Sequence, residues 1–106
     1  MGYSVRITEA FEEDLFDVLT YLIETRGAHG AAERIMREVD GAKALLVTQP
    51  FIHAVSKKSR FGDFAYREHF IKGYVIVYRI AEEEVLFLRF FHQAQLYERF
   101  VMEWER

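Results

Sequence analysis

The chain has 106 residues, half of them apolar and only one of them proline, which suits a single folded domain, residues 1–106, with a hydrophobic core of its own. It contains no cysteine, which excludes a disulfide framework, a thiolate metal site and a cysteine nucleophile. The formal net charge is −3, and neither a signal peptide nor an apolar run of membrane-spanning length is present. We therefore expect a cytoplasmic protein that does not enter the membrane.

The N-terminal residues predict a short strand followed by a helix. Residues 3–8, YSVRIT, alternate apolar and polar side chains, as a half-buried strand does. Thr8 can cap the helix that follows, because a threonine oxygen can accept a free amide hydrogen of the first turn. The apolar stripe of this helix runs from Phe11 to Ile23, and Gly27 is placed to end it.

A second amphipathic helix follows the short connection GAHG, residues 27–30. Its apolar stripe runs from Ala31 to Leu46, and Pro50 ends it. Two helices joined by so few residues predict an antiparallel hairpin.

The second half of the chain predicts a loop over residues 51–62 and then three strands. The strands are expected at Asp63–Phe70, Tyr74–Ile80 and Val85–His92, and their short connections require antiparallel neighbours. The last two strands are apolar on both faces. We expect the hairpin to cover one face and the C-terminal tail, or a partner, to cover the other.

The tail, residues 93–106, places apolar side chains at helical spacing and predicts a short C-terminal helix. The fold class is therefore α+β. An N-terminal strand joins an antiparallel sheet to give about four strands, and a two-helix antiparallel hairpin packs on that sheet.

Positive charge is concentrated in the middle of this acidic chain. Residues 53–79 contain six lysines and arginines against two acidic residues, whereas both flanking segments are acidic. Such a basic segment is a candidate surface for nucleic acid or an acidic protein segment, and a solvated loop is the alternative.

The order of these elements, with several motifs, resembles the RelE/ParE superfamily of bacterial type II toxins, often described as plasmid stabilization proteins. The motifs are VRITEAFEEDLFDVLTYL at 5–22, Pro50 after the second helix, YRE at 66–68, GYVIVYRI at 73–80 and LRFFHQ at 88–93. The resemblance implies a toxin held in a hetero-oligomer by a cognate antitoxin, ParD-like or RelB-like, that is encoded beside it.

Two activities occur in this superfamily: RelE-like members cut mRNA on the ribosome, and ParE-like members poison DNA gyrase. Val75, Ala94 and Phe100 stand where RelE-like ribonucleases carry two arginines and a tyrosine, so the ribonuclease constellation is depleted. The resemblance therefore favours a ParE-like gyrase inhibitor that is not an enzyme. A RelE-like endoribonuclease, and a non-toxic member that only binds its antitoxin, remain the alternatives.

The candidate target-binding residues come from the basic segment and from the ends of the strands. They are Lys57, Lys58, Arg60, Arg67, Arg89, His92 and Tyr97. Arg67 is the first choice, and Arg67, Arg89 and His92 are the catalytic candidates if the protein is a ribonuclease.

The two arginines within apolar strands, Arg79 and Arg89, need partners, for which Glu84 and Asp63 are available. The turn at residues 82–83 leaves open which of Arg79, Arg89 and His92 share a face.

No cofactor or metal is expected. The four histidines are dispersed along the chain, without the close spacing of a zinc site, and no glycine-rich phosphate loop is present.

Overall fold

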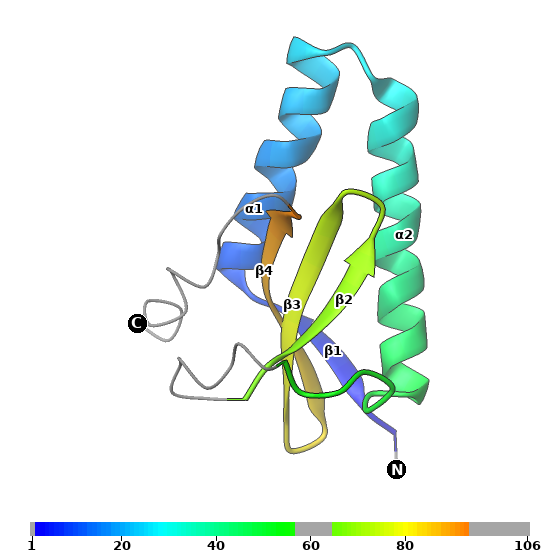
Figure 1. Ribbon diagram of the computed structural model, residues 1–106, viewed down its shortest axis with the longest axis vertical. Coiled ribbons are helices and arrows are strands. Elements are labelled where there is room, and N and C mark those ends of the chain that lie inside the picture. Colours follow the sequence, from blue (N-terminus) through cyan, green and yellow to red (C-terminus); the bar gives the residue numbers. More distant parts are fainter. Residues whose placement is uncertain (1, 57–64, 94–106) are drawn as a thin grey trace.

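A four-stranded sheet with a helical hairpin on one face makes up the fold of the computed structural model, which describes residues 2–56 and 65–93 (Figure 1). The strand order is β1-β4-β3-β2. Along the chain the elements are β1 (Ser4–Ile7), α1 (Glu9–Thr20), the π-helical turn η1 (Tyr21–Thr25), α2 (His29–Thr48), β2 (Arg67–Ile71), β3 (Tyr74–Ala81) and β4 (Glu84–His92). The predicted α+β class and the two-helix hairpin are confirmed, and the predicted C-terminal helix falls outside the described residues.

The sheet is mixed. β2, β3 and β4 are antiparallel neighbours, as their short connections predict. β1 instead pairs in parallel with β4, from Ser4 opposite Glu84 to Ile7 opposite Phe87. The hairpin and two strands separate β1 from β4 in the sequence, so no short turn forces these two strands to be antiparallel.

Thr8 joins the start of α1 to the sheet. Its Oγ1 accepts a hydrogen bond from the Phe11 amide at 3.2 Å, which confirms the predicted cap. The same hydroxyl donates to the Phe87 carbonyl oxygen at 2.8 Å. One side chain therefore fixes where α1 begins and how it sits on β4.

The predicted first helix has two parts. α1 passes at Tyr21 into the wider turn η1, and Gly27 then ends the helix with a φ of 61°. Ala28 closes the end by donating its amide hydrogen to the Leu22 carbonyl at 2.7 Å. A π-turn winds more loosely than an α-helix. Ile23, predicted to lie in the buried stripe, is therefore exposed.

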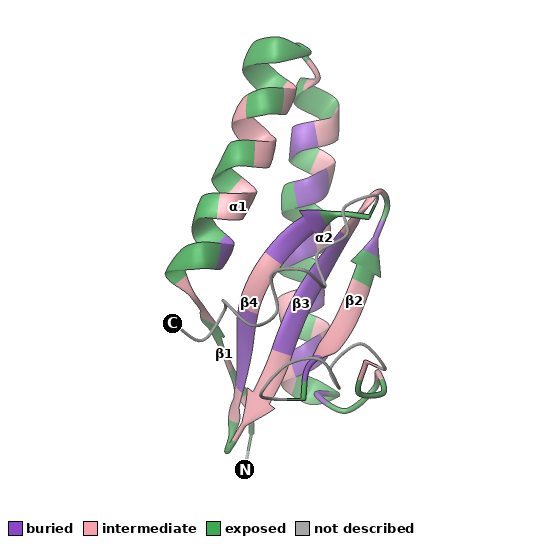
Figure 2. Ribbon diagram, turned by 60° about the vertical axis from the view of Figure 1, so that its left-hand side comes forward, coloured by how far each residue is buried: buried purple, intermediate pink, exposed green. Residues whose placement is uncertain are grey.

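The core lies between the hairpin and the sheet, and strands β3 and β4 are largely buried (Figure 2). Aromatic side chains dominate its centre, where Phe11 of α1 contacts the rings of Phe87 and Phe90. A second cluster of buried residues contains Tyr66, Val75, Val77 and Phe91. These positions alternate along β3 and β4 with those of the main core, which confirms that the two strands are apolar on both faces.

A β-bulge fixes the register that the sequence left open. Val77 lies opposite Arg89, but the next residue, Tyr78, lies opposite Phe87. Arg79 therefore shares the face of Val77 and Arg89, whereas His92, opposite Tyr74, lies on the helix side.

β2 begins at Arg67, later in the chain than predicted. Ala65 and Tyr66 precede the strand, and residues 63–64 lie outside the described part. None of the helices within residues 2–56 and 65–93 has the length and apolar character needed to cross a bilayer.

Candidate functional site

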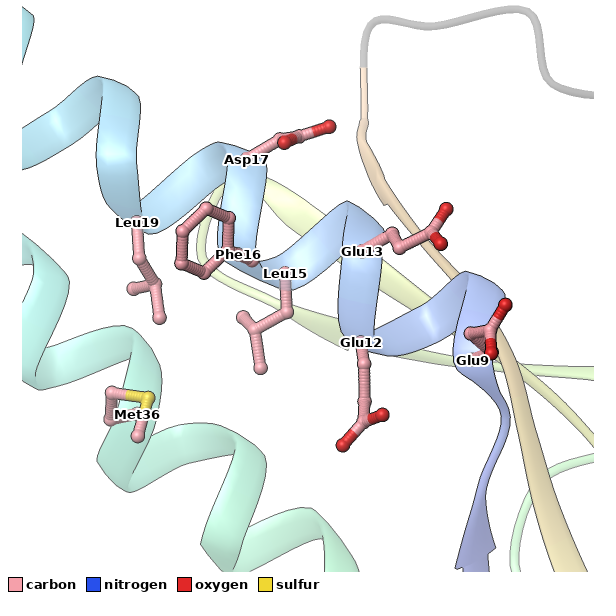
Figure 3. A pocket seen from close by; sticks show the side chains of 8 residues that line it. All are labelled: Glu9, Glu12, Glu13, Leu15, Phe16, Asp17, Leu19 and Met36. Atoms are coloured by element: carbon pink, nitrogen blue, oxygen red, sulfur yellow. The ribbon is translucent and has the colours of Figure 1, made fainter.

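An apolar groove lies between the two helices, on their solvent side. It has a volume of about 490 Å³. Leu15 and Leu19 project from α1 toward α2, where Met36 lies, and Phe16 stands beside them with the strands behind the helix (Figure 3). Phe16 is 67% exposed and Met36 is 45% exposed, and the groove brings these two exposed apolar side chains together.

A second hollow continues this groove toward the tip of the hairpin. It has a volume of about 270 Å³ and shares Leu19 and Met36 with the first. Ala32 contributes to it, and Ile23, turned outward by η1, borders it. We call the two hollows together the hairpin groove.

The rim of the hairpin groove is acidic. Among the described residues that line it, five are carboxylates and none is a lysine or arginine; the carboxylates are Glu9, Glu12, Glu13, Asp17 and Glu33. Glu13 and Asp17 point away from α2, while Glu12 points to the same side as Leu15 (Figure 3). An apolar floor with an acidic rim suits a partner segment that presents apolar side chains between basic ones.

Sequence reasoning did not identify this groove. Phe16 lies about 100° around the helix from Leu15 but only about 60° from Leu19, so it borders the buried stripe of α1. A large apolar residue at the border between the apolar stripe and the polar face of its helix was the available signal, and Met36, next to the buried Ile35, gives the same signal in α2.

Arg67, the first choice from the sequence, is engaged within the chain. Its guanidinium donates a hydrogen bond to the His53 carbonyl oxygen and lies 5.2 Å from the centre of the Phe51 ring. Its position opposite Tyr78 puts it on the helix side of the sheet. In this arrangement Arg67 holds the segment that follows α2.

Arg89 is also engaged. Its Nε and Nη2 donate to the two carboxylate oxygens of Asp14 at 2.7 and 3.0 Å, and its guanidinium lies 5.0 Å from the Phe91 ring centre. The expected partners were Glu84 and Asp63. For Arg89 the structure gives Asp14 in their place, and Glu84 pairs with Arg6 across the β1–β4 edge. Asp63 lies outside the described residues, as do Lys57, Lys58, Arg60 and Tyr97.

His92 ends β4 and is exposed. Its ring meets Tyr74 edge to face, with 5.2 Å between the ring centres. Arg67, Arg89 and His92, the three proposed ribonuclease residues, thus contact three different sets of neighbours in the described part of the chain.

His53 and His69, which no pattern in the sequence connects, form a pair. His53 Nε2 and His69 Nδ1 are 2.9 Å apart, and both rings are partly buried. Burial lowers the pKa of His69, the nearby His53 lowers it further, and Glu38 acts in the opposite direction. The two residues are 16 positions apart, and no sequence spacing predicts their contact.

Among the residues that the structure describes, no group of three or more histidine, aspartate or glutamate side chains is placed to hold a metal ion.

The comparisons with known proteins agree with this fold. The family model described as "ParE toxin of type II toxin-antitoxin system, parDE" matches residues 5–97. The chain is also similar to a solved structure described as "Chromosomal ParDE TA system from P. aeruginosa", with 16% sequence identity and a TM-score of 0.67, over 85% of this chain and 95% of that one. No curated protein sequence matches the chain.

Proposed function

Because the chain belongs to the ParE toxin family of type II toxin–antitoxin systems, we propose that it inhibits DNA gyrase and is neutralised by a cognate antitoxin that occupies the hairpin groove. The proposed place of action is the cytoplasm, where gyrase and DNA are found.

The hairpin groove is the observation that carries the antitoxin part of the proposal. A toxin that is held inactive needs a surface on which its partner binds tightly, and exposed aromatic and methionine side chains dominate such surfaces. Phe16 and Met36 supply these side chains on rigid helices. The expected occupant is an amphipathic helix of the antitoxin with lysine or arginine on either side of its apolar stripe.

The contacts of the arginines support an inhibitor over a ribonuclease. RNA cleavage needs cationic and acid–base groups that converge on one phosphate. Arg67 is directed at His53 and Phe51, and Arg89 at Asp14. Target binding is assigned to the remaining candidates, Lys57, Lys58, Arg60, His92 and Tyr97.

The test uses purified full-length chain and purified gyrase in a DNA supercoiling assay. The proposal predicts loss of supercoiling and accumulation of cleaved DNA, both reversed by adding the antitoxin encoded beside the toxin gene. A matched reaction with ribosomes and mRNA serves as the control. Cleaved mRNA together with unaffected supercoiling would reject gyrase in favour of the ribonuclease alternative.

The groove is tested separately. Phe16→Lys should reduce rescue by the antitoxin while inhibition of gyrase persists, because the variant leaves the proposed target-binding residues unchanged. Phe70→Lys is the matched control: Phe70 is 56% exposed, but it lies on β2, away from the groove.

A further inference from the structure

Residues 49–56, which we call the post-helix segment, are attached to β2 and to the residue before it. The Ser56 amide donates to the Tyr66 carbonyl oxygen at 2.7 Å, and Val55 forms an isolated antiparallel bridge with Arg67. Arg67 also donates to the backbone of His53. The hydrogen bond between His53 and His69 is the attachment that depends on protons.

A hydrogen bond between two imidazoles needs one nitrogen with a hydrogen and one without. The pair at 2.9 Å satisfies this requirement when both rings are neutral, and also when one of them is protonated. When both rings are protonated, no acceptor remains and two positive charges face each other. The same contact then repels.

The groups around the pair do not remove this repulsion. Glu38 of α2 favours the protonated form of His69, but its carboxylate is also 3.3 Å from Arg34. On the β2 side, the Arg67 guanidinium adds positive charge at the His53 carbonyl.

From β3, the ring of Tyr78 lies 6.4 Å from that of His53. Tyr78 contributes no negative charge near neutral pH, since tyrosine is neutral there and burial raises its pKa further, to about 12.

We propose that His53 and His69 form a proton-sensitive latch, which holds the post-helix segment on β2 while at least one of the two rings is neutral and releases it when both are protonated. The cause is the geometry of the pair: the two ring nitrogens face each other in a partly buried site between α2 and the sheet.

The latch has a second consequence, which rests on the proposed function. The post-helix segment leads directly into Lys57, Lys58 and Arg60, three of the residues assigned to target binding. Release of the latch would free the segment that precedes these residues in the chain, so acidification would weaken inhibition of the target.

Hydrogen exchange at the Ser56 amide tests the latch itself and does not depend on any target. The full chain is made by cell-free synthesis, and the protection factor of Ser56 is measured at pH 7.5 and pH 5.0 and corrected for intrinsic exchange. We expect protection to fall by roughly tenfold at the lower pH, the effect of losing one net hydrogen bond of ordinary strength. The amide of Val77, in the buried strand β3, should keep its protection.

The variant His69→Gln supplies the control, since glutamine stays neutral at both pH values. Protection of Ser56 in this variant should not change with pH, while His29→Gln, at the exposed start of α2, should behave as the unaltered protein does. Equal protection of Ser56 at both pH values in the unaltered chain would overturn the latch.

A second measurement covers the case in which His69→Gln does not fold. The ring signals of His53 and His69 are followed by NMR during a pH titration of the unaltered chain. We expect the titration of the two rings to be coupled, with the pKa of His69 lowered by burial and by the facing His53. Two independent titrations near pH 6.5 would overturn the proposal.

Discussion

Asp14 and Arg89 form a two-pronged ion pair that joins α1 to β4, and the same carboxylate also accepts a hydrogen bond from the Phe90 amide at 3.0 Å. β1 pairs with β4 only as far as Phe87. Beyond the end of β1, Asp14 therefore accepts the hydrogen bond of a β4 backbone amide that would otherwise lack a partner.

Removal of this carboxylate should destabilise the fold. Asp14→Ala leaves Arg89 and the Phe90 amide without their acceptor, and we expect a loss of about 2–3 kcal/mol in the free energy of unfolding. Urea unfolding measures it. Glu84→Ala, which removes the exposed pair with Arg6, is the matched control and should cost less than about 1 kcal/mol. Equal losses would contradict a structural role for Asp14.

Two glycines in the hairpin should respond to alanine in opposite directions. Gly27 has a φ of 61°, where a Cβ is strained, so Gly27→Ala should destabilise by about 1 kcal/mol. Gly41 lies exposed within α2 with no atom near an added Cβ, so Gly41→Ala should stabilise by about 0.5–1 kcal/mol. Thermal unfolding of both variants measures the two shifts, and a shift of the same sign in both would be inconsistent with the hairpin described.

Tyr78 should make the fold sensitive to alkali. Its hydroxyl is buried without a hydrogen-bond partner in the described part of the chain, and burial raises its pKa to about 12. A raised folded-state pKa gives stability that is complete below pH 10, the unfolded value, and is lost as the pH rises toward 12.

Tyr78→Phe should therefore unfold less readily between pH 10 and 12. At pH 7 it should be neutral or stabilising by about 1–2 kcal/mol, because it removes a buried hydroxyl that forms no hydrogen bond with the described residues. Denaturation curves at pH 7 and pH 11 measure both effects. A variant that is less stable at pH 7 would mean that the hydroxyl has a partner.

Binding of the antitoxin should depend on Phe16 and Met36. Truncation of either side chain to alanine should weaken the complex roughly tenfold, the usual effect of losing an interface anchor, without changing the unfolding midpoint by more than a small amount. Calorimetry with the purified antitoxin measures the affinity. Phe70→Ala is the control, and an equal loss there would place the antitoxin elsewhere.

The groove's acidic rim predicts a salt dependence. Glu12→Lys should slow association with a basic antitoxin segment. Higher salt should likewise slow association of the unaltered toxin with the antitoxin, because it screens the same attraction. Stopped-flow association rates at two salt concentrations measure both effects. Rates that do not respond to salt would argue against a basic partner.

Much of the fold could be predicted from the sequence because its signals are local. The cap at Thr8, the stop at Gly27 and the alternating strands each depend on neighbours within a few residues. The parallel pairing of β1 and the bulge beside Val77 depend on contacts between distant segments and could not be read locally.

The candidate sites were harder to predict for the same reason. Basic residues are easily identified as candidates in a sequence, but their partners are not. Arg67 bonds to His53, 14 positions away, and Arg89 pairs with Asp14, 75 positions away. Phe16 was available as a signal, because it is a large apolar residue at the border of the buried stripe of its helix.

Pulse labelling of DNA and protein synthesis, in cells sampled just after tightly controlled induction of this chain alone, tests the central claim most directly. Inhibition of gyrase predicts that incorporation of thymidine falls first, while incorporation of amino acids continues. An early fall in protein synthesis with DNA synthesis still running would contradict the claim and indicate action on the ribosome.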